Sequence, residues 1–265
     1  MEKVSDIINR LDSPKAGAEP QFKCALCEDV GYIIQGDKVK ECSCRKVSEL
    51  ARKRKNAGIT PHLAKMQFAD FDYSFYTTEQ RGKNRSTYRD NARLTVAAAQ
   101  RFSESIKKGE PTEGMLLMGS VGCGKTYLAA SIANDLVEHD VDVKFVVVPD
   151  FLDELRYTFT DTTAAKELEL MEQVKSVSVL ILDDLGAHNY TDWSIKTLFS
   201  IINYRVNYEL PMVVTTNLSV EEIEDLIGSR IYSRLVESCG LYQMRCSYDI
   251  RAAMRKRGNS LNKQK

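Results

Sequence analysis

No apolar run in this sequence approaches the roughly 18 residues that a membrane-spanning helix needs. The first six residues, MEKVSD, contain no apolar core of a secretory signal. Net charge is lacking as well, because 37 lysines and arginines balance 37 aspartates and glutamates, so charge alone indicates no nucleic-acid partner. From these absences we expect a cytoplasmic protein with no membrane partner.

Histidine is scarce, and its three copies are scattered, so the sequence offers no histidine-based metal site or catalytic triad. Cysteine is more frequent. Seven cysteines without an export signal favour a reducing compartment over a disulfide scaffold. Four of them form a C-x₂-C…C-x-C pattern, at Cys24, Cys27, Cys42 and Cys44. Four thiolates are typical of a closed structural Zn²⁺ site, and free thiols or an iron–sulfur cluster are the alternatives.

The segment between the two cysteine pairs predicts a hairpin, with apolar residues at 30–34 and 39 and a turn at Gly36-Asp37. A short amphipathic helix is predicted before this module, over residues 3–12, and a basic helix after it, over about 45–57. So small a hairpin buries little core, and the module therefore depends on its metal for folding.

One eight-residue stretch matches the phosphate-loop pattern G-x-x-x-x-G-K-[ST]. It follows a short apolar strand at 115–118 and precedes a helix that starts near 127, as phosphate binding by backbone N–H groups and a helix N-terminus requires. In this pattern the lysine reaches the β- and γ-phosphates and the following hydroxyl ligates Mg²⁺. The residues are Gly119, Ser120, Val121, Gly122, Cys123, Gly124, Lys125 and Thr126.

From residue 87 onward, after a helix over about 87–107, strands and helices alternate. Apolar strands are predicted at 114–118, 143–148, 178–183, 211–216 and 241–246, and helices near 125–138, 150–158, 164–174 and 191–208. Strands that are apolar on both faces belong to a sheet covered on both sides. The alternation therefore predicts a three-layer α/β/α domain with a parallel sheet.

Polar residues end two of these strands. Asp183 and Asp184 follow a strand about 60 residues after the phosphate loop, where Asp183 is a natural partner for Mg²⁺. Asp184 either orients the water that attacks the γ-phosphate or caps the following loop. Asn217 either contacts that water or the γ-phosphate, or forms a turn before a helix capped by Ser219.

These parts in this order resemble the AAA+ ATPases, and within them the helicase loaders of the DnaC/DnaI type, which are related to the IstB-type transposition helpers. The resemblance covers roughly residues 55–255. Besides the phosphate loop, it rests on Gly58-Ile59-Thr60-Pro61, Phe68-Ala69-Asp70-Phe71, Leu180-Ile181-Leu182-Asp183-Asp184-Leu185-Gly186, Ile201-Ile202-Asn203-Tyr204-Arg205, Thr215-Thr216-Asn217-Leu218 and Ser229-Arg230-Ile231-Tyr232-Ser233-Arg234-Leu235.

The resemblance implies roles for single residues. Asn217 takes the place of the sensor 1 residue, Arg251 that of the sensor 2 arginine at the nucleotide, and Arg234 that of the arginine finger, with Arg230 as the alternative. Arg156 becomes a candidate DNA contact. Most AAA+ proteins carry glutamate where this chain has Asp184, and the shorter carboxylate implies slow hydrolysis.

The resulting expectation is an ATPase, stimulated by DNA, that uses ATP, Mg²⁺ and Zn²⁺. Residues 1–57 form a zinc-binding region that holds a replicative hexameric helicase of the DnaB type, 58–86 a linker, and 87–265 the AAA+ ATPase domain. ATP-bridged self-association and single-stranded DNA complete the predicted loader. A transposition helper is the alternative, followed by a nucleic-acid adaptor with a degenerate ATPase site and by a metabolic kinase.

Overall fold

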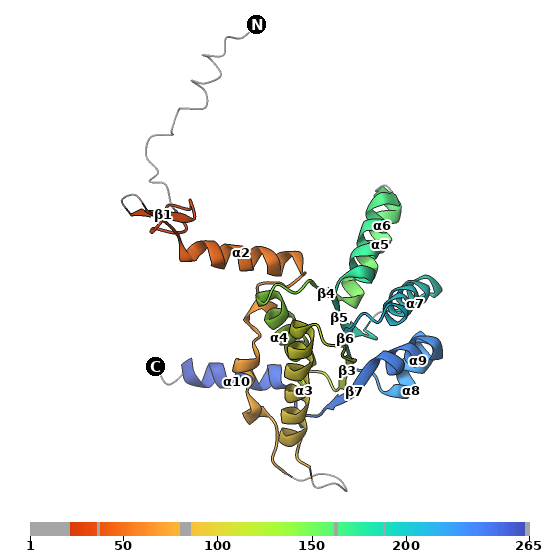
Figure 1. Cartoon of the computed structure of the whole chain (residues 1–265). Coiled ribbons are helices and arrows are strands. Elements are labelled where there is room, and N and C mark those ends of the chain that lie inside the picture. The colour runs from red at the N-terminus through yellow and green to blue at the C-terminus, as the bar shows by residue number, and fades with distance from the viewer. Residues whose placement is uncertain (1–21, 36–37, 80–85, 162–163, 188, 263–265) are drawn as a thin grey trace. The chain divides into compact units, whose positions relative to one another are not determined.

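The computed structural model describes residues 22–35, 38–79, 86–161, 164–187 and 189–262. The chain divides into two compact units, residues 1–51 and residues 52–265 (Figure 1). The helix predicted over residues 3–12 and the turn at Gly36-Asp37 lie outside the described residues. None of the helices in the described ranges combines the length and apolar character that a membrane crossing demands.

The N-terminal unit contains the predicted hairpin. Strands β1 (Tyr32–Gln35) and β2 (Lys38–Glu41) pair antiparallel, and α2 (Ser43–Asn56) follows. Within residues 22–51, the buried side chains of the described part are two cysteines, Cys27 and Cys42. The core of this unit is therefore its cysteine cluster rather than an apolar interior.

The second unit contains a five-stranded sheet in the order β4-β5-β6-β3-β7, and every adjacent pair is parallel. The strands are β3 (Gly114–Gly119), β4 (Val143–Val147), β5 (Val179–Leu185), β6 (Met212–Thr216) and β7 (Cys239–Met244). All five predicted strands are confirmed, and so is the predicted fold class. Because β3 lies beside β6 and close to β5, the chain segments that follow these strands meet at one edge of the sheet.

Helices cover both faces of this sheet (Figure 1). One layer contains α3 (Tyr88–Lys108) and α4 (Lys125–Glu138). The other contains α5 (Val148–Asp161), α6 (Ala164–Ser176), α7 (Asp192–Asn207), α8 (Val220–Ile227) and α9 (Ser229–Ser238). Alternate strand residues, such as Leu180 and Leu182, enter the core of this second layer. The last described helix is α10 (Ile250–Asn262).

Local sequence signals fix the helix ends. Thr87 forms a capping box with Asp90 at the start of α3, and Thr191 and Ser219 do the same for α7 and α8. After α2, Gly58 has φ +78°, and a Cβ there would lie 2.4 Å from the Phe145 carbonyl oxygen. Only glycine fits, and it lets the Ala57 carbonyl accept a hydrogen bond from the Phe145 N–H at 2.7 Å.

The described residues between α2 and α3 contain no long helix or strand, and they pack on α4. It forms three short 3₁₀ helices, η1 (Leu63–Lys65), η2 (Phe68–Asp70) and η3 (Tyr73–Phe75). The Asn134 amide donates to the carbonyls of Leu63 at 2.9 Å and Met66 at 3.0 Å, and the Tyr127 hydroxyl donates to that of Gln67 at 3.1 Å. These side-chain bonds replace the regular ladder that the segment lacks.

Arg205 of α7 is fully buried, with 0% of its surface exposed. Its guanidinium donates to five backbone carbonyls, those of Val174, Lys175, Val177, Ser178 and Pro211, at 2.8–3.3 Å. These carbonyls belong to the end of α6 and the segments that lead into β5 and β6. Burial lowers the pKa of this guanidinium to about 10, which leaves it charged at neutral pH. One side chain therefore supplies hydrogen-bond donors to five backbone carbonyls where α6, α7, β5 and β6 meet.

We expect Arg205→Ala to lower the free energy of unfolding by about 3 kcal/mol, because it leaves buried carbonyls without donors. Arg205→Lys should cost less but still destabilise, since an ammonium lacks the planar fork. Urea unfolding followed through the fluorescence of the single tryptophan, Trp193 on the same helix, measures both. The exposed Arg101→Ala on α3 is the matched control. Equal midpoints for Arg205→Ala and Arg101→Ala would contradict the assigned role.

Candidate functional site

A cavity of about 800 Å³ lies at the carboxyl ends of the central strands. Four parts of the chain line it: residues 62–76, the phosphate loop with the start of α4, the ends of β4, β5 and β6, and the start of α10. The predicted site residues among its lining are Val121, Gly122, Gly124, Lys125, Thr126, Asp183, Asp184, Asn217 and Arg251. The fold thus brings together predicted site residues up to 130 positions apart in the sequence, from Val121 to Arg251.

The phosphate loop has the tight backbone that its glycines allow. Gly119 has φ +149°, and a Cβ there would lie 2.1 Å from the Met244 carbonyl oxygen. Gly122 has φ +73°, and a Cβ would overlap the Asp249 carboxylate. Two outside groups hold the loop: the Tyr76 hydroxyl donates to the Cys123 carbonyl at 2.8 Å, and the N–H of Ile250, the first residue of α10, donates to the Gly122 carbonyl at 3.0 Å.

A hydrogen-bonded chain crosses the cavity floor from Lys125 to Asp184. The Lys125 Nζ donates to Asn217 Oδ1 at 2.7 Å, and Asn217 Nδ2 donates to Asp184 Oδ1 at 2.8 Å. The same ammonium donates to the carbonyls of Gly119 and Ser120, both at 2.8 Å. The arrangement leaves Asn217 in contact with both a cation and an anion, at the end of β6.

Asp183 is buried beside this chain, with 5% of its surface exposed. Burial raises the pKa of its carboxyl group, and hydrogen bonds from the hydroxyls of Thr215 and Thr126 oppose that shift. The Thr215 hydroxyl donates to Asp183 Oδ1 at 2.7 Å and accepts from the Asp184 N–H at 2.9 Å. The Asp183 carboxylate and the Thr126 hydroxyl beside it provide oxygen ligands of the types that Mg²⁺ prefers, so these two side chains fit the ion.

Asp184 adopts a left-handed backbone conformation, with φ +63°. It lies where the pairing register between β5 and β6 shifts, between Leu182 and Leu185. A non-glycine residue at positive φ costs free energy and is more frequent at functional sites. The irregularity turns successive carboxylates in different directions, Asp183 toward Thr215 and Asp184 toward Asn217.

The other end of the cavity is apolar and was not foreseen from the sequence as a binding surface. Leu63, Met66, Phe71 and Phe75, from the segment predicted to be a linker, line it together with Met254 of α10. The 3₁₀ turns give these residues no helical or strand periodicity. The one available signal was their aromatic density, because four aromatic residues lie at positions 71, 73, 75 and 76.

Helix α10 is held against this apolar end by Arg257. Its guanidinium lies 4.1 Å from the Phe75 ring centroid and donates to the Ser74 hydroxyl at 3.0 Å and to Asp72 Oδ2 at 3.5 Å. Arg251, on the first turn of the same helix, lines the cavity. One helix therefore contributes to both ends of the site.

The remaining predicted arginines lie elsewhere. Among the described residues that line the cavity, Arg230 and Arg234 do not occur; both lie on α9, on the opposite face of the sheet. Arg230 is exposed, and Arg234 pairs with Glu237 at 2.8 Å. Arg156 is exposed on α5, with its guanidinium 5.8 Å from the Trp193 ring centroid. None of the three can act on this chain's own cavity in this arrangement.

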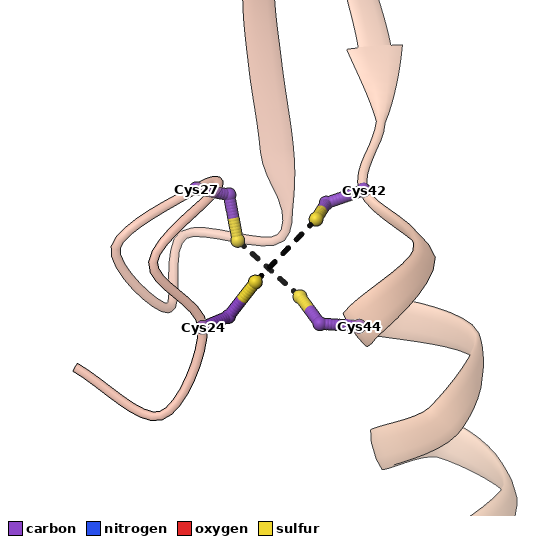
Figure 2. A group of neighbouring side chains, drawn as sticks. All are labelled: Cys24, Cys27, Cys42 and Cys44. Atoms are coloured by element: carbon purple, nitrogen blue, oxygen red, sulfur yellow. Dashed lines mark hydrogen bonds between the residues drawn. The ribbon is translucent and has the colours of Figure 1, made fainter.

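The four predicted metal-ligating cysteines converge in the N-terminal unit (Figure 2). Their sulfur atoms all lie within 4.8 Å of one another, with 3.7 Å between Cys24 and Cys42 and 3.3 Å between Cys27 and Cys44. Cys24 and Cys27 lie in the loop before β1, and Cys42 and Cys44 at the start of α2. A backbone N–H, that of Gly31, donates to Cys27 Sγ at 3.3 Å.

This geometry fits a tetrahedral zinc ion. Zinc–sulfur bonds of about 2.3 Å place the sulfurs of a tetrahedron about 3.8 Å apart, close to the spacing found here. The pKa of Cys44 is raised because the thiols of Cys27 and Cys42 lie against it. Four thiolates at this spacing therefore need a cation between them.

Comparison with known proteins gives a consistent result. Residues 29–246 match the family described as IstB-like ATP binding protein. The replicative helicase loader DnaC of Escherichia coli (strain K12) is 27% identical over 241 residues, which cover 89% of this chain and 90% of DnaC. The phage-like element PBSX protein XkdC of Bacillus subtilis (strain 168) is 26% identical over 262 residues, 91% of each chain.

Other relatives are matched over a smaller part. The replicative helicase loader DnaI of Bacillus subtilis (strain 168) is 33% identical over 124 residues, which cover 46% of this chain and 39% of DnaI. Across three such curated relatives the matched share of their own length ranges from 39% to 60%.

Solved structures show the same fold. A crystal structure of DnaI has a TM-score of 0.53 at 24% identity and covers 72% of this chain and 93% of that chain. A crystal structure of the DnaC helicase loader has a TM-score of 0.54 at 21% identity and covers 70% of this chain and 100% of that chain. At these identities the likeness concerns the fold alone.

The donor set predicts one zinc ion per chain. We expect metal analysis of the purified protein to find about one equivalent of zinc, and Cys27→Ser to lose it, because three thiolates bind the ion far more weakly. Cys239→Ser, which changes a buried cysteine outside the cluster, should retain the zinc. Retention by Cys27→Ser, or loss by Cys239→Ser, would show that the cluster is not the zinc site.

Proposed function

This chain belongs to the IstB-like ATP-binding protein family, and on that premise we propose that it is an ATP-dependent loader of a replicative hexameric helicase. ATP binding and hydrolysis would control its assembly on, and release from, a DnaB-type helicase on single-stranded DNA. The observation that carries the proposal is the match to a helicase loader over 89% of this chain and 90% of that protein.

The cavity supports nucleotide binding because its two ends differ in chemistry. Lys125, the loop N–H groups and the N-terminus of α4 supply positive charge and donors for phosphates at one end. Leu63, Phe71 and Phe75 supply an apolar surface for a purine base at the other. The volume of about 800 Å³ falls within the range of small-molecule pockets.

In the proposed reaction, Lys125 leaves its carbonyl acceptors and binds the β- and γ-phosphates. Thr126 and Asp183 would hold Mg²⁺, which neutralises phosphate charge as the leaving group departs. Asp184 and Asn217 already share a hydrogen bond, so together they can orient a water on the γ-phosphate. The aspartate side chain reaches one methylene less far than glutamate, which favours slow turnover.

Two arginines at different places would complete the site. Arg251 lines the cavity and can contact the phosphates of a nucleotide bound to the same chain. Arg234 is positioned away from its own cavity, as a residue offered to a neighbouring protomer's nucleotide must be, and Arg230 on the same helix is the alternative. Nucleotide binding would thereby be coupled to self-association.

The N-terminal unit would hold the helicase. Its hairpin and the loop before it expose apolar side chains that no core covers among the described residues of this unit: Leu26, Val30, Ile34 and Val39 are 67–77% exposed. Exposed apolar patches of this kind mark protein interfaces. Single-stranded DNA would contact the second unit, where Arg156 on α5 is exposed for phosphate binding.

A transposition helper of the IstB type is the second candidate, and the family described as IstB-like ATP binding protein is the observation that favours it. Purification of the full chain from its host with ATP and Mg²⁺, followed by identification of the bound proteins, separates the two. We expect a hexameric helicase, and much less of it with Lys125→Ala. Recovery of a transposase in its place would overturn the loader assignment.

The arginine finger has its own test, by mixing variants. Lys125→Ala should bind ATP at least about 100-fold more weakly, and Arg234→Ala should bind ATP but hydrolyse it at least about 100-fold more slowly. Mixed together with single-stranded DNA, the two should recover measurable hydrolysis, because a Lys125→Ala protomer still offers Arg234 to its neighbour. Arg230→Ala, four residues away on the same helix, is the matched control.

No recovery on mixing, with each variant folded, would contradict action of Arg234 in a neighbouring protomer. Loss of hydrolysis in Arg230→Ala and not in Arg234→Ala would transfer the role to Arg230.

A further inference from the structure

Three cysteines lie outside the zinc cluster, and the fold brings two of them together. Cys123 is in the phosphate loop, and Cys246 lies between β7 and α10, 123 residues later. Their side chains interact with each other, beside Lys125. The third, Cys239, lies buried at the start of β7 with 4% of its surface exposed.

The two thiols have different surroundings. Cys123 is fully buried, and its sulfur lies 3.8 Å from the Lys125 Nζ. Cys246 is partly exposed, and its sulfur lies 3.6 Å from the Ser120 hydroxyl oxygen. A reagent from solvent can therefore reach the Cys246 sulfur, whereas the Cys123 sulfur is closed to solvent.

The surroundings also favour reaction at Cys246. Hydrogen bonds from the Cys123 thiol, the Ser120 hydroxyl and the Tyr248 N–H lower the pKa of Cys246 to about 6, and the charge of Lys125 adds to them. The hydrogen bond with the Cys246 thiol, and then burial, raise the pKa of Cys123. The thiolate, which is the nucleophilic form, is therefore favoured at the accessible sulfur of Cys246 over the buried sulfur of Cys123.

We propose that Cys123 and Cys246 form a modification site at which hydrogen peroxide creates a disulfide that blocks the phosphate loop. The inference rests on the proposed nucleotide binding at that loop and adds a regulation of it.

The chemistry balances in two steps. The Cys246 thiolate attacks one peroxide oxygen, the O–O bond breaks, and sulfenic acid forms with release of hydroxide, which takes up a proton to give water. The Cys123 sulfur then attacks the Cys246 sulfur, and a second water leaves with the Cys123 proton. Two thiols lose two electrons, and one peroxide is reduced to two waters. A dithiol such as dithiothreitol reverses the change by exchange.

The disulfide would fix the loop in its nucleotide-free arrangement. Cys123 lies between Gly122 and Gly124, whose left-handed backbones shape the loop around phosphates. The Gly122 carbonyl already accepts a hydrogen bond from the Ile250 N–H, four residues after Cys246. A covalent bond added to this contact opposes the movement by which Lys125 leaves the Gly119 and Ser120 carbonyls, and phosphate then has no free ammonium to bind.

The test uses the full, zinc-loaded chain with and without hydrogen peroxide, followed by catalase. Peptide mapping without reductant should find a cross-link between the peptides of Cys123 and Cys246. Affinity for a fluorescent ATP analogue should fall at least tenfold in the oxidised protein and return with dithiothreitol. Cys246→Ser should keep its affinity under peroxide, whereas Cys239→Ser should behave like the parent. Zinc content, measured in each sample, reports oxidation of the cysteine cluster separately.

Each outcome is informative. Absence of the cross-link, or unchanged affinity in cross-linked protein, overturns the inference. Equal loss of affinity in Cys246→Ser would attribute the effect to other cysteines and also overturn it. Failure of the reduced parent to bind ATP would overturn the proposed function instead, and the peptide map would still show whether the disulfide forms.

Discussion

The hydrogen-bonded chain from Lys125 through Asn217 to Asp184 depends on the order of strands in the sheet. Lys125 follows β3, Asp184 belongs to β5, and Asn217 follows β6, so the three groups meet only because β6 lies between the other two. Parallel pairing places all three carboxyl ends at one edge. Every other feature of the site, including the buried Asp183 and the docked α10, is arranged around this edge.

The two units of the chain are stabilised by different interactions, apolar packing in the second and a cysteine cluster in the first. The second unit has a conventional apolar interior on both faces of its sheet, reinforced where Arg205 satisfies five carbonyls. The N-terminal unit buries little besides Cys27 and Cys42 among its described residues. We therefore expect its shape to depend on the metal that the four sulfurs can hold.

The sequence was informative where a pattern is local. Doubly apolar strands, glycine in the phosphate loop and paired cysteines each carry their meaning within a few residues, and the fold class and family relation predicted from them are confirmed. Long-range features gave no such signal. The apolar end of the cavity consists of 3₁₀ turns without periodicity, an isolated arginine such as Arg205 gives no sign of burial, and no spacing rule pairs Cys123 with Cys246.

In the proposed nucleotide site, three distant segments close around one nucleotide. Hydrogen exchange with mass spectrometry, with and without ATP and Mg²⁺, tests it most directly on the reduced, zinc-loaded chain. Nucleotide should slow exchange together in residues 119–127, in the apolar segment 62–76 and at the start of α10, and leave the N-terminal hairpin unchanged. Unaltered exchange in the phosphate loop, or protection confined to a different face of the sheet, would contradict the proposed site.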